Sequence, residues 1–122
     1  MMAYLDAWNR ADVEQVIDAY HVPSLVHSEG EVRPQLTGPS RLEFLGSYVD
    51  STREALAAGA AWTCPSLEVQ PLGADAALAT ARWVFTTADG RAAEDYFDSY
   101  LLVRVEGRWY ILADAIHRDA GG

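Results

Sequence analysis

The apolar residues of this chain change their spacing once, after Gly59, and this change limits the folds that the chain can adopt. Before Gly59 they recur with the helical period of about 3.6 residues. After Gly59 they alternate with polar residues, as they do in half-buried strands. Helices that precede the strands, rather than alternate with them, predict a segregated α+β fold.

Short turns divide the second half of the chain into strands. Turns at Asp89-Gly90 and Glu106-Gly107 are too short to hold a crossover helix, so the strands they join run antiparallel. The sequence therefore predicts a meander of four strands, at 62–72, 76–87, 91–105 and 108–117.

The first helical region is expected at about 3–20, before Pro23. Asp12 and Gln15 form a plausible capping pair, which predicts a break into two helices within 9–12. Leu25 and Val26 predict a short strand over 24–28, and the polar stretch that follows is expected to be a loop with at most a brief strand at 32–36.

A longer helix is expected at 40–58. Ser40 followed by Glu43 predicts a capping box at its start, and Gly59 predicts its end. Its apolar stripe, which is expected to face the core, consists of Leu42, Leu45, Tyr48, Val49, Thr52 and Leu56.

Composition excludes several classes of protein. The 122 residues include 9 basic residues, all Arg, against 18 acidic ones, for a net charge of −9, so neither nucleic acid nor an anionic membrane surface is an expected partner. A single cysteine, Cys64, cannot form an internal disulfide. The chain has no run of about 18 apolar residues and no signal peptide pattern, so we expect one cytoplasmic domain over 1–122.

Several segments, taken in order, resemble one family. They are Tyr4–Asp12, Thr37-Gly38-Pro39, Val69–Gly73 leading into Ala76–Ala79, the hairpin Arg104–Trp109, and Ile116-His117. Over about 3–118 the chain resembles the nuclear transport factor 2-like superfamily, close to its bacterial SnoaL-like branch. The resemblance implies a cystatin-like cone, in which a curved antiparallel sheet wraps around the long helix and encloses an apolar cavity. Family members include steroid isomerases, polyketide cyclases, epoxide hydrolases and dehydratases, so the fold does not fix a reaction.

Homodimers joined through the outer sheet face are common in this superfamily. The predicted strand at 91–105 supports this expectation, because both of its faces are apolar. Phe97 and Leu101 lie on one face, and Tyr96 and Tyr100 lie on the other. One face can cover the helices, and the other needs a partner.

The steroid isomerase branch implies three candidate catalytic residues. Tyr4 matches the tyrosine of its first helix, and Asp98 lies near its late-strand acid, whose surrounding aromatic residues favour the neutral carboxyl. The position of the family's catalytic base holds Ser28, a departure that argues against steroid isomerisation itself. The adjacent His27 is then the candidate base.

These positions are expected to converge on one cavity, lined by Tyr4, His27, Tyr48, Trp62, Asp98 and Tyr100, of which Tyr48, Trp62 and Tyr100 would bind the ligand. The expectation depends on strand register, since a shift of one residue would turn Asp98 outward and Ser99 inward. The epoxide hydrolase Asp-Arg-Asp set has no recognisable match in Arg82 and Asp98.

The predicted function is binding of a small apolar molecule. One hypothesis is an enzyme with isomerase, cyclase or hydrolase chemistry on a cyclic substrate, and the alternative is a non-catalytic carrier or a dimeric interaction module. A base together with a polar partner inside the cavity would favour the enzyme. We expect no cofactor and no metal. The acidic and histidine residues of 21–31 lack metal-ligand spacing, and Cys64 has no recognisable histidine partner.

Overall fold

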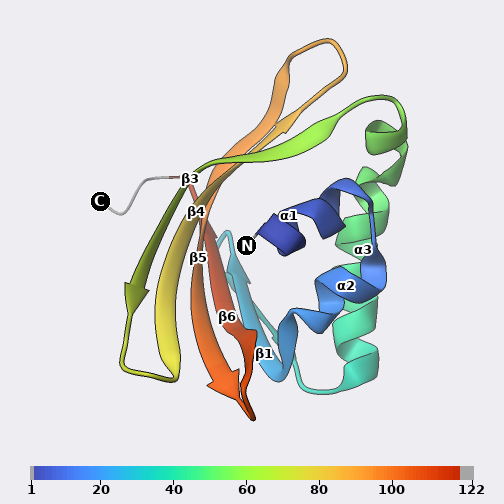
Figure 1. Cartoon of the computed structure of the whole chain (residues 1–122). Coiled ribbons are helices and arrows are strands. Elements are labelled where there is room, and N and C mark those ends of the chain that lie inside the picture. The colour runs from blue at the N-terminus through green and yellow to red at the C-terminus, as the bar shows by residue number, and fades with distance from the viewer. Residues whose placement is uncertain (1, 119–122) are drawn as a thin grey trace.

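A curved six-stranded sheet covers the helices on one side, as the computed structural model shows for residues 2–118 (Figure 1). The strand order is β2-β1-β6-β5-β4-β3, so β2 and β3 form the open edges. Neighbouring strands are antiparallel except for β1 and β6, which run parallel. The elements are α1 (Met2–Asn9), α2 (Val13–Asp18), β1 (Tyr20–Ser28), β2 (Glu31–Gln35), α3 (Gly38–Ala57), β3 (Ala61–Pro71), β4 (Ala76–Thr86), β5 (Ala92–Val105) and β6 (Arg108–His117).

The predicted α+β fold is therefore confirmed, and so is the antiparallel meander over β3–β6. The break between the first two helices is also confirmed, because the Asp12 side chain accepts a hydrogen bond from the Gln15 backbone at the start of α2. Among residues 2–118, none of the helices combines the length and the apolar character that a membrane span requires.

The first helical region ends earlier than predicted. α2 stops at Asp18, and Tyr20 begins β1, a strand that includes Pro23. The sheet decides this boundary, because the Ile111 backbone nitrogen donates a 2.7 Å hydrogen bond to the carbonyl of Ala19 and draws the chain alongside β6. Helical spacing alone does not reveal this tertiary pairing.

The capping box of α3 is formed by a different pair from the one predicted. Thr37, not Ser40, is the N-cap, and each of the two side chains accepts a hydrogen bond from the backbone nitrogen of the other. Pro39 explains the difference, since proline suits the first turn of a helix and so lies inside α3. At the other end, Gly59 adopts a positive φ of 107°, consistent with its predicted role as a helix terminator.

The core lies between α1–α3 and the concave face of the sheet. Alternation along β4 turns Ala79, Ala81, Trp83 and Phe85 inward, and all four are buried. Val49 of α3 is completely buried, but Leu42 and Tyr48 of the predicted core stripe are about half exposed. Tyr48 lies near the middle of α3 and lines the cavity described below, which leaves its side chain partly exposed.

Candidate functional site

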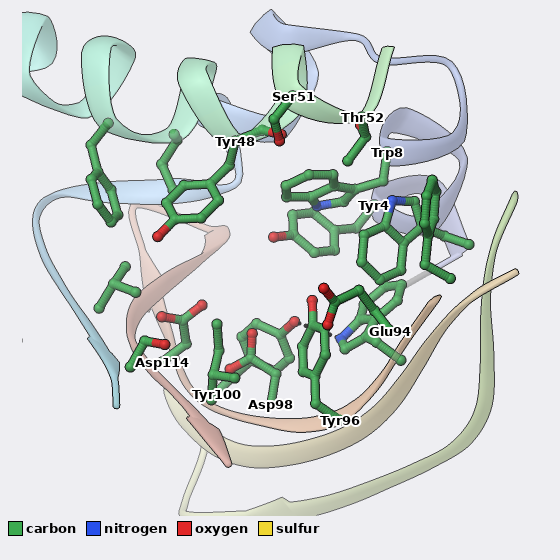
Figure 2. Close-up of a pocket in the computed structure, with 18 of the residues that line it drawn as sticks. Tyr4, Trp8, Tyr48, Ser51, Thr52, Glu94, Tyr96, Asp98, Tyr100 and Asp114 are labelled. Atoms are coloured by element: carbon green, nitrogen blue, oxygen red, sulfur yellow. Dashed lines mark hydrogen bonds between the residues drawn. The ribbon is translucent and has the colours of Figure 1, made fainter. Parts of the chain in front are cut away.

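A cavity of about 600 Å³ lies between the concave face of the sheet and α3 (Figure 2). This volume is in the range that small-molecule sites occupy. Ten aromatic side chains form most of its wall, namely Tyr4, Trp8, Tyr20, Phe44, Tyr48, Trp62, Trp83, Phe85, Tyr96 and Tyr100. Exposed Glu29, Glu94 and Arg118 also line it and mark its mouth.

Asp98 enters this cavity from β5. Residues of β5 alternate between the two faces of the sheet, and Asp98 pairs with the fully buried Ala81 on the concave side. The Asp98 side chain is 5% exposed, and Tyr96 and Tyr100 lie on the same face. The register that turns Asp98 inward, on which the sequence prediction depended, is the one observed.

A second carboxyl group, Asp114 of β6, lies beside Asp98. The parallel pairing of β1 with β6 places it opposite Val26, and it is 6% exposed. Sequence reasoning missed this residue, although one signal was available: Asp114 is the sole charged residue in the apolar run 111–116. We refer to Asp98 and Asp114 as the carboxyl pair.

A chain of hydroxyl groups leads to Asp114. Tyr20 donates a hydrogen bond to Oδ2 of Asp114 over 2.8 Å, and the hydroxyl oxygens of Tyr4 and Tyr20 lie 3.1 Å apart. Because Tyr20 has one hydroxyl proton and gives it to Asp114, Tyr4 must be the donor in its contact with Tyr20. The order of donation is therefore Tyr4 to Tyr20 to Asp114.

A similar chain leads to Asp98. The indole nitrogen of Trp83 donates to the hydroxyl of Tyr100 over 2.9 Å, which leaves the Tyr100 proton for Asp98. This hydrogen bond lowers the pKa of Asp98, but two stronger effects oppose it. Burial raises the pKa of Asp98 well above its usual value, and the negative charge of Asp114 raises it further.

The two acids therefore differ in protonation. Burial raises the pKa of Asp114 to about 6, while hydrogen bonds from Tyr20 and Asp98 limit the rise. Asp114, with a pKa of about 6, is the acid of the pair that ionises below neutrality, and Asp98, whose pKa is raised by both burial and the charge of Asp114, is the one that holds a proton and donates it toward Asp114. Two acids in one low-dielectric site that separate in this way form a matched donor and base.

Each acid also has a carboxyl oxygen without a partner. Among the residues that the structure describes, Oδ1 of Asp98 and Oδ1 of Asp114 are buried and have no hydrogen-bond partner. Figure 2 shows both side chains directed into the space beneath α3, facing Tyr48 and Ser51. A buried carboxyl oxygen without a partner is costly, so a bound molecule that contacts both oxygens would stabilise the site.

Five of the six predicted lining residues are in the cavity, and His27 is not. The prediction for His27 is wrong because its neighbours Val26 and Ser28 face inward, and alternation along β1 turns the imidazole to the exposed outer face. A histidine there cannot reach a ligand in the cavity. Ser28, at the position of the family's base, does line the cavity.

Tyr4 lies in the cavity wall, but its hydroxyl group is bonded to Tyr20 and not to Asp98. Its ring packs edge-on against Tyr100 and Trp83, with centroids 6.3 Å and 6.0 Å away. Its hydroxyl is engaged with Tyr20, and burial raises its pKa above the usual tyrosine value. The Tyr4 hydroxyl therefore acts on Asp114, through Tyr20, and not on Asp98.

The other polar side chains that were considered lie elsewhere. Cys64 of β3 donates to the carbonyl of Ser66 over 3.3 Å, outside the cavity lining, and burial raises the pKa of its thiol. Within residues 2–118, no group of three or more His, Cys, Asp or Glu side chains is arranged to hold a metal ion. The carboxyl pair is therefore the candidate site.

The chain belongs to a family described as NTF2-like protein (DUF6841), whose profile matches residues 1–119. The family resemblance seen in the sequence is thereby confirmed at the level of the superfamily. No curated protein sequence matches the chain.

Solved structures share the fold at low sequence identity. An NTF2-like protein with a cystatin-like fold from Novosphingobium aromaticivorans superposes with a TM-score of 0.77 at 14% identity, over 98% of this chain and 77% of that one. A candidate ketosteroid isomerase from Shewanella frigidimarina gives 0.71 at 16% identity, over 94% and 89%. The association domain of CaMKII from C. elegans gives 0.72 at 18% identity, over 95% and 88%. These likenesses establish the fold alone.

Proposed function

We propose that this protein binds a small, largely apolar cyclic molecule in the aromatic cavity and transfers a proton on it. In this proposal ionised Asp114 is the base and protonated Asp98 is the acid. The observation that carries the proposal is the carboxyl pair itself: two buried acids of different protonation, each with an oxygen that has no partner, at the wall of a cavity of about 600 Å³.

The geometry supports an acid–base role in three ways. The aromatic walls keep water away from the carboxyl pair, so a proton donor there acts in a medium of low dielectric. The hydroxyl chain fixes the Asp114 carboxylate in place. A pKa of about 6 for Asp114 lies near neutrality, where a base both is ionised and retains affinity for a proton.

The alternative is a carrier that only binds its ligand. A purely apolar cavity would favour a carrier, whereas a base and an acid that converge inside the cavity favour catalysis. The candidate ketosteroid isomerase among the structural neighbours is consistent with proton transfer. The resemblance to the steroid isomerase branch implies an acidic base where this chain has Ser28, so in this proposal Asp114 of β6 takes that role. The active residues in this proposal are therefore Asp98 and Asp114.

A proton-exchange assay tests the proposal. The probe is β-tetralone, a bicyclic ketone whose acidic C–H hydrogens exchange with deuterium in heavy water and can be followed by NMR. We expect the protein to accelerate this exchange, and Asp114→Asn to lose most of the acceleration because the amide is not a base. Asp98→Asn should lose about two to three orders of magnitude, the usual loss for one stabilising donor.

The matched control is Asp6→Asn, which removes one carboxylate from the exposed side of α1 and should exchange at the wild-type rate. Binding is followed in parallel through the fluorescence of the cavity tryptophans. Binding without accelerated exchange would make the protein a carrier, and the absence of both would reject the cavity as the site.

A further inference from the structure

The charged groups of the cavity are unbalanced. Four acids line it, and Arg118 is the one basic side chain among the described lining residues. Arg118 is already engaged at the mouth, 3.7 Å from the Glu94 carboxylate and above the ring of Tyr96. The buried carboxyl pair therefore has no cation of the described chain beside it.

The carboxyl pair needs a positive partner more than the acids at the mouth do. Glu29 and Glu94 are exposed and hydrated, whereas Asp114 is 6% exposed and has a bare Oδ1. Attraction between a carboxylate and a cation is much stronger at such a buried position than in water. Tyr20 donates a hydrogen bond to one oxygen of Asp114, and Trp83 and Tyr100 form the corresponding chain to Asp98. These donors are uncharged, so they do not neutralise the negative charge of the carboxyl pair.

The walls suit a cation as well. The faces of tryptophan and tyrosine rings attract positive charge, and Trp8, Trp62, Trp83 and Tyr96 all line the cavity. The mouth gives a direct example, because the Arg118 guanidinium lies 5.8 Å from the centroid of Tyr96. The net charge of −9 also raises the local concentration of cations around the molecule.

We infer that the natural ligand is a ring compound with a protonated nitrogen, and that this nitrogen lies against the bare oxygens of the carboxyl pair. The apolar part of the ligand fills the space between the aromatic side chains of the cavity. The negative charges of Glu29 and Glu94 at the mouth repel anionic analogues. This inference rests on the proposed function only in taking the cavity as the ligand site, and it does not require that a reaction occurs.

The test uses three probes of similar shape. Tetrahydroisoquinoline carries a protonated ring nitrogen, tetralin is its uncharged carbocycle, and tetralin carboxylate is the anion. Binding to the full chain is measured at neutral pH through tryptophan fluorescence. We expect the amine to bind at least about tenfold more tightly than tetralin, as one cation–π contact and one buried ion pair would give, and the anion to bind more weakly than both.

The variant Asp114→Asn should lose the part of the preference for the amine that the ion pair contributes and keep only the smaller part due to the aromatic rings, whereas Asp6→Asn should keep the full wild-type preference. Equal binding in the wild type, or a preference for the anion, would overturn the inference and leave the proposed function intact. If none of the three probes binds, the cavity is not the ligand site and both proposals fail.

A second measurement needs only the wild-type protein. The groups around Asp114 are Tyr20 from β1, Tyr4 from α1, and Asp98 and Tyr100 from β5, while α3 contributes no charged side chain to the lining. Of these, Asp114, with a pKa of about 6, loses its negative charge as the pH falls from about 8 to about 5, and Asp98, whose pKa is also raised, changes charge in the same sense. Affinity for the amine should therefore fall across this range while affinity for tetralin stays constant, and a parallel fall for both would contradict the inference.

Discussion

The hydroxyl group of Tyr20 donates a hydrogen bond of 2.8 Å to Oδ2 of Asp114, although 94 residues separate the two in the chain. The parallel pairing of β1 with β6 brings them together. The bond satisfies one carboxyl oxygen, and the other, Oδ1, is buried and has no partner among the described residues. One strand pairing thus holds the carboxylate in the cavity wall and leaves one of its oxygens without a hydrogen bond.

Removing this hydrogen bond should raise the pKa of Asp114. The bond favours the ionised carboxylate, so Tyr20→Phe is expected to move the pKa upward from about 6 by about one unit, the equivalent of one hydrogen bond to a charged group. A carbon-13 NMR titration of labelled aspartate measures this shift. Tyr110→Phe, a change outside the cavity, should leave the Asp114 titration unmoved. An unchanged Asp114 titration in Tyr20→Phe would show that the hydroxyl chain does not control this acid.

The stability of the protein should fall as pH rises through the titration of Asp114. The pKa of Asp114 is about 6 in the folded chain and about 3.8 in the unfolded chain, so between these values the folded state binds more protons. The free energy of unfolding then decreases with rising pH, by about 3 kcal/mol across the window for this group. Asp98 acts in the same direction, since its pKa is also raised by burial.

Urea unfolding at about pH 4 and about pH 8 measures this effect. Asp114→Asn should flatten the dependence and be more stable than the wild type at the higher pH, because it removes a buried negative charge. A wild-type protein that becomes more stable across this window, or an Asn variant that loses stability at high pH, would contradict the assignment of Asp114 as a buried carboxylate.

The sequence predicted the elements well where local pattern and tertiary structure agree. Alternation in the second half of the chain placed all four strands of the meander, and it placed Asp98 and Tyr100 on the same face of β5, while the direction of that face was left open. The cap at Asp12 was also readable, because it depends on a neighbour three residues away. In each of these cases the interaction that decides the structure is local or follows the period of the element.

The errors come from interactions between distant residues. β1 begins at Tyr20 because β6 pairs with it, and this pairing, together with the inward direction of Val26 and Ser28, turns His27 outward. The sequence does not single out Asp114, because a lone acid in an apolar strand matches none of the catalytic positions that the family resemblance implies. Its partner Asp98 was found because the late-strand acid of the steroid isomerase branch suggested it.

The start of α3 gives a test of the revised capping box. Thr37→Ala removes the side chain that accepts from the Ser40 backbone nitrogen, and it should lower the free energy of unfolding by about 1 kcal/mol. Glu43→Ala removes the residue of the predicted box that the structure does not use, so its effect should be within about 0.5 kcal/mol. Urea unfolding of both variants distinguishes the two boxes, and a larger loss for Glu43→Ala would restore the original prediction.

The outer face of the sheet is expected to form a homodimer. Leu101 of β5 pairs with Leu78 of β4 on this face, and beside them Thr80, Ser99 and His117 form a row of hydrogen bonds across three strands. A sheet face exposed to water usually carries more charged side chains than this one does, so we predict that a second copy of the chain covers it. Sedimentation velocity should give twice the mass of one chain for the wild type.

Leu101→Asp should convert this dimer to a monomer, because it places a charge at the centre of the predicted interface. Leu36→Asp is the matched control: Leu36 is 67% exposed and lies between β2 and α3, away from the outer face of the meander, so this variant should stay dimeric. Cavity binding of tetralin should survive in the Leu101 variant, since the described cavity is lined by residues of one chain. A wild-type protein that sediments as a monomer at all concentrations would reject the dimer and leave the outer face to be explained by the hydrogen-bonded row alone.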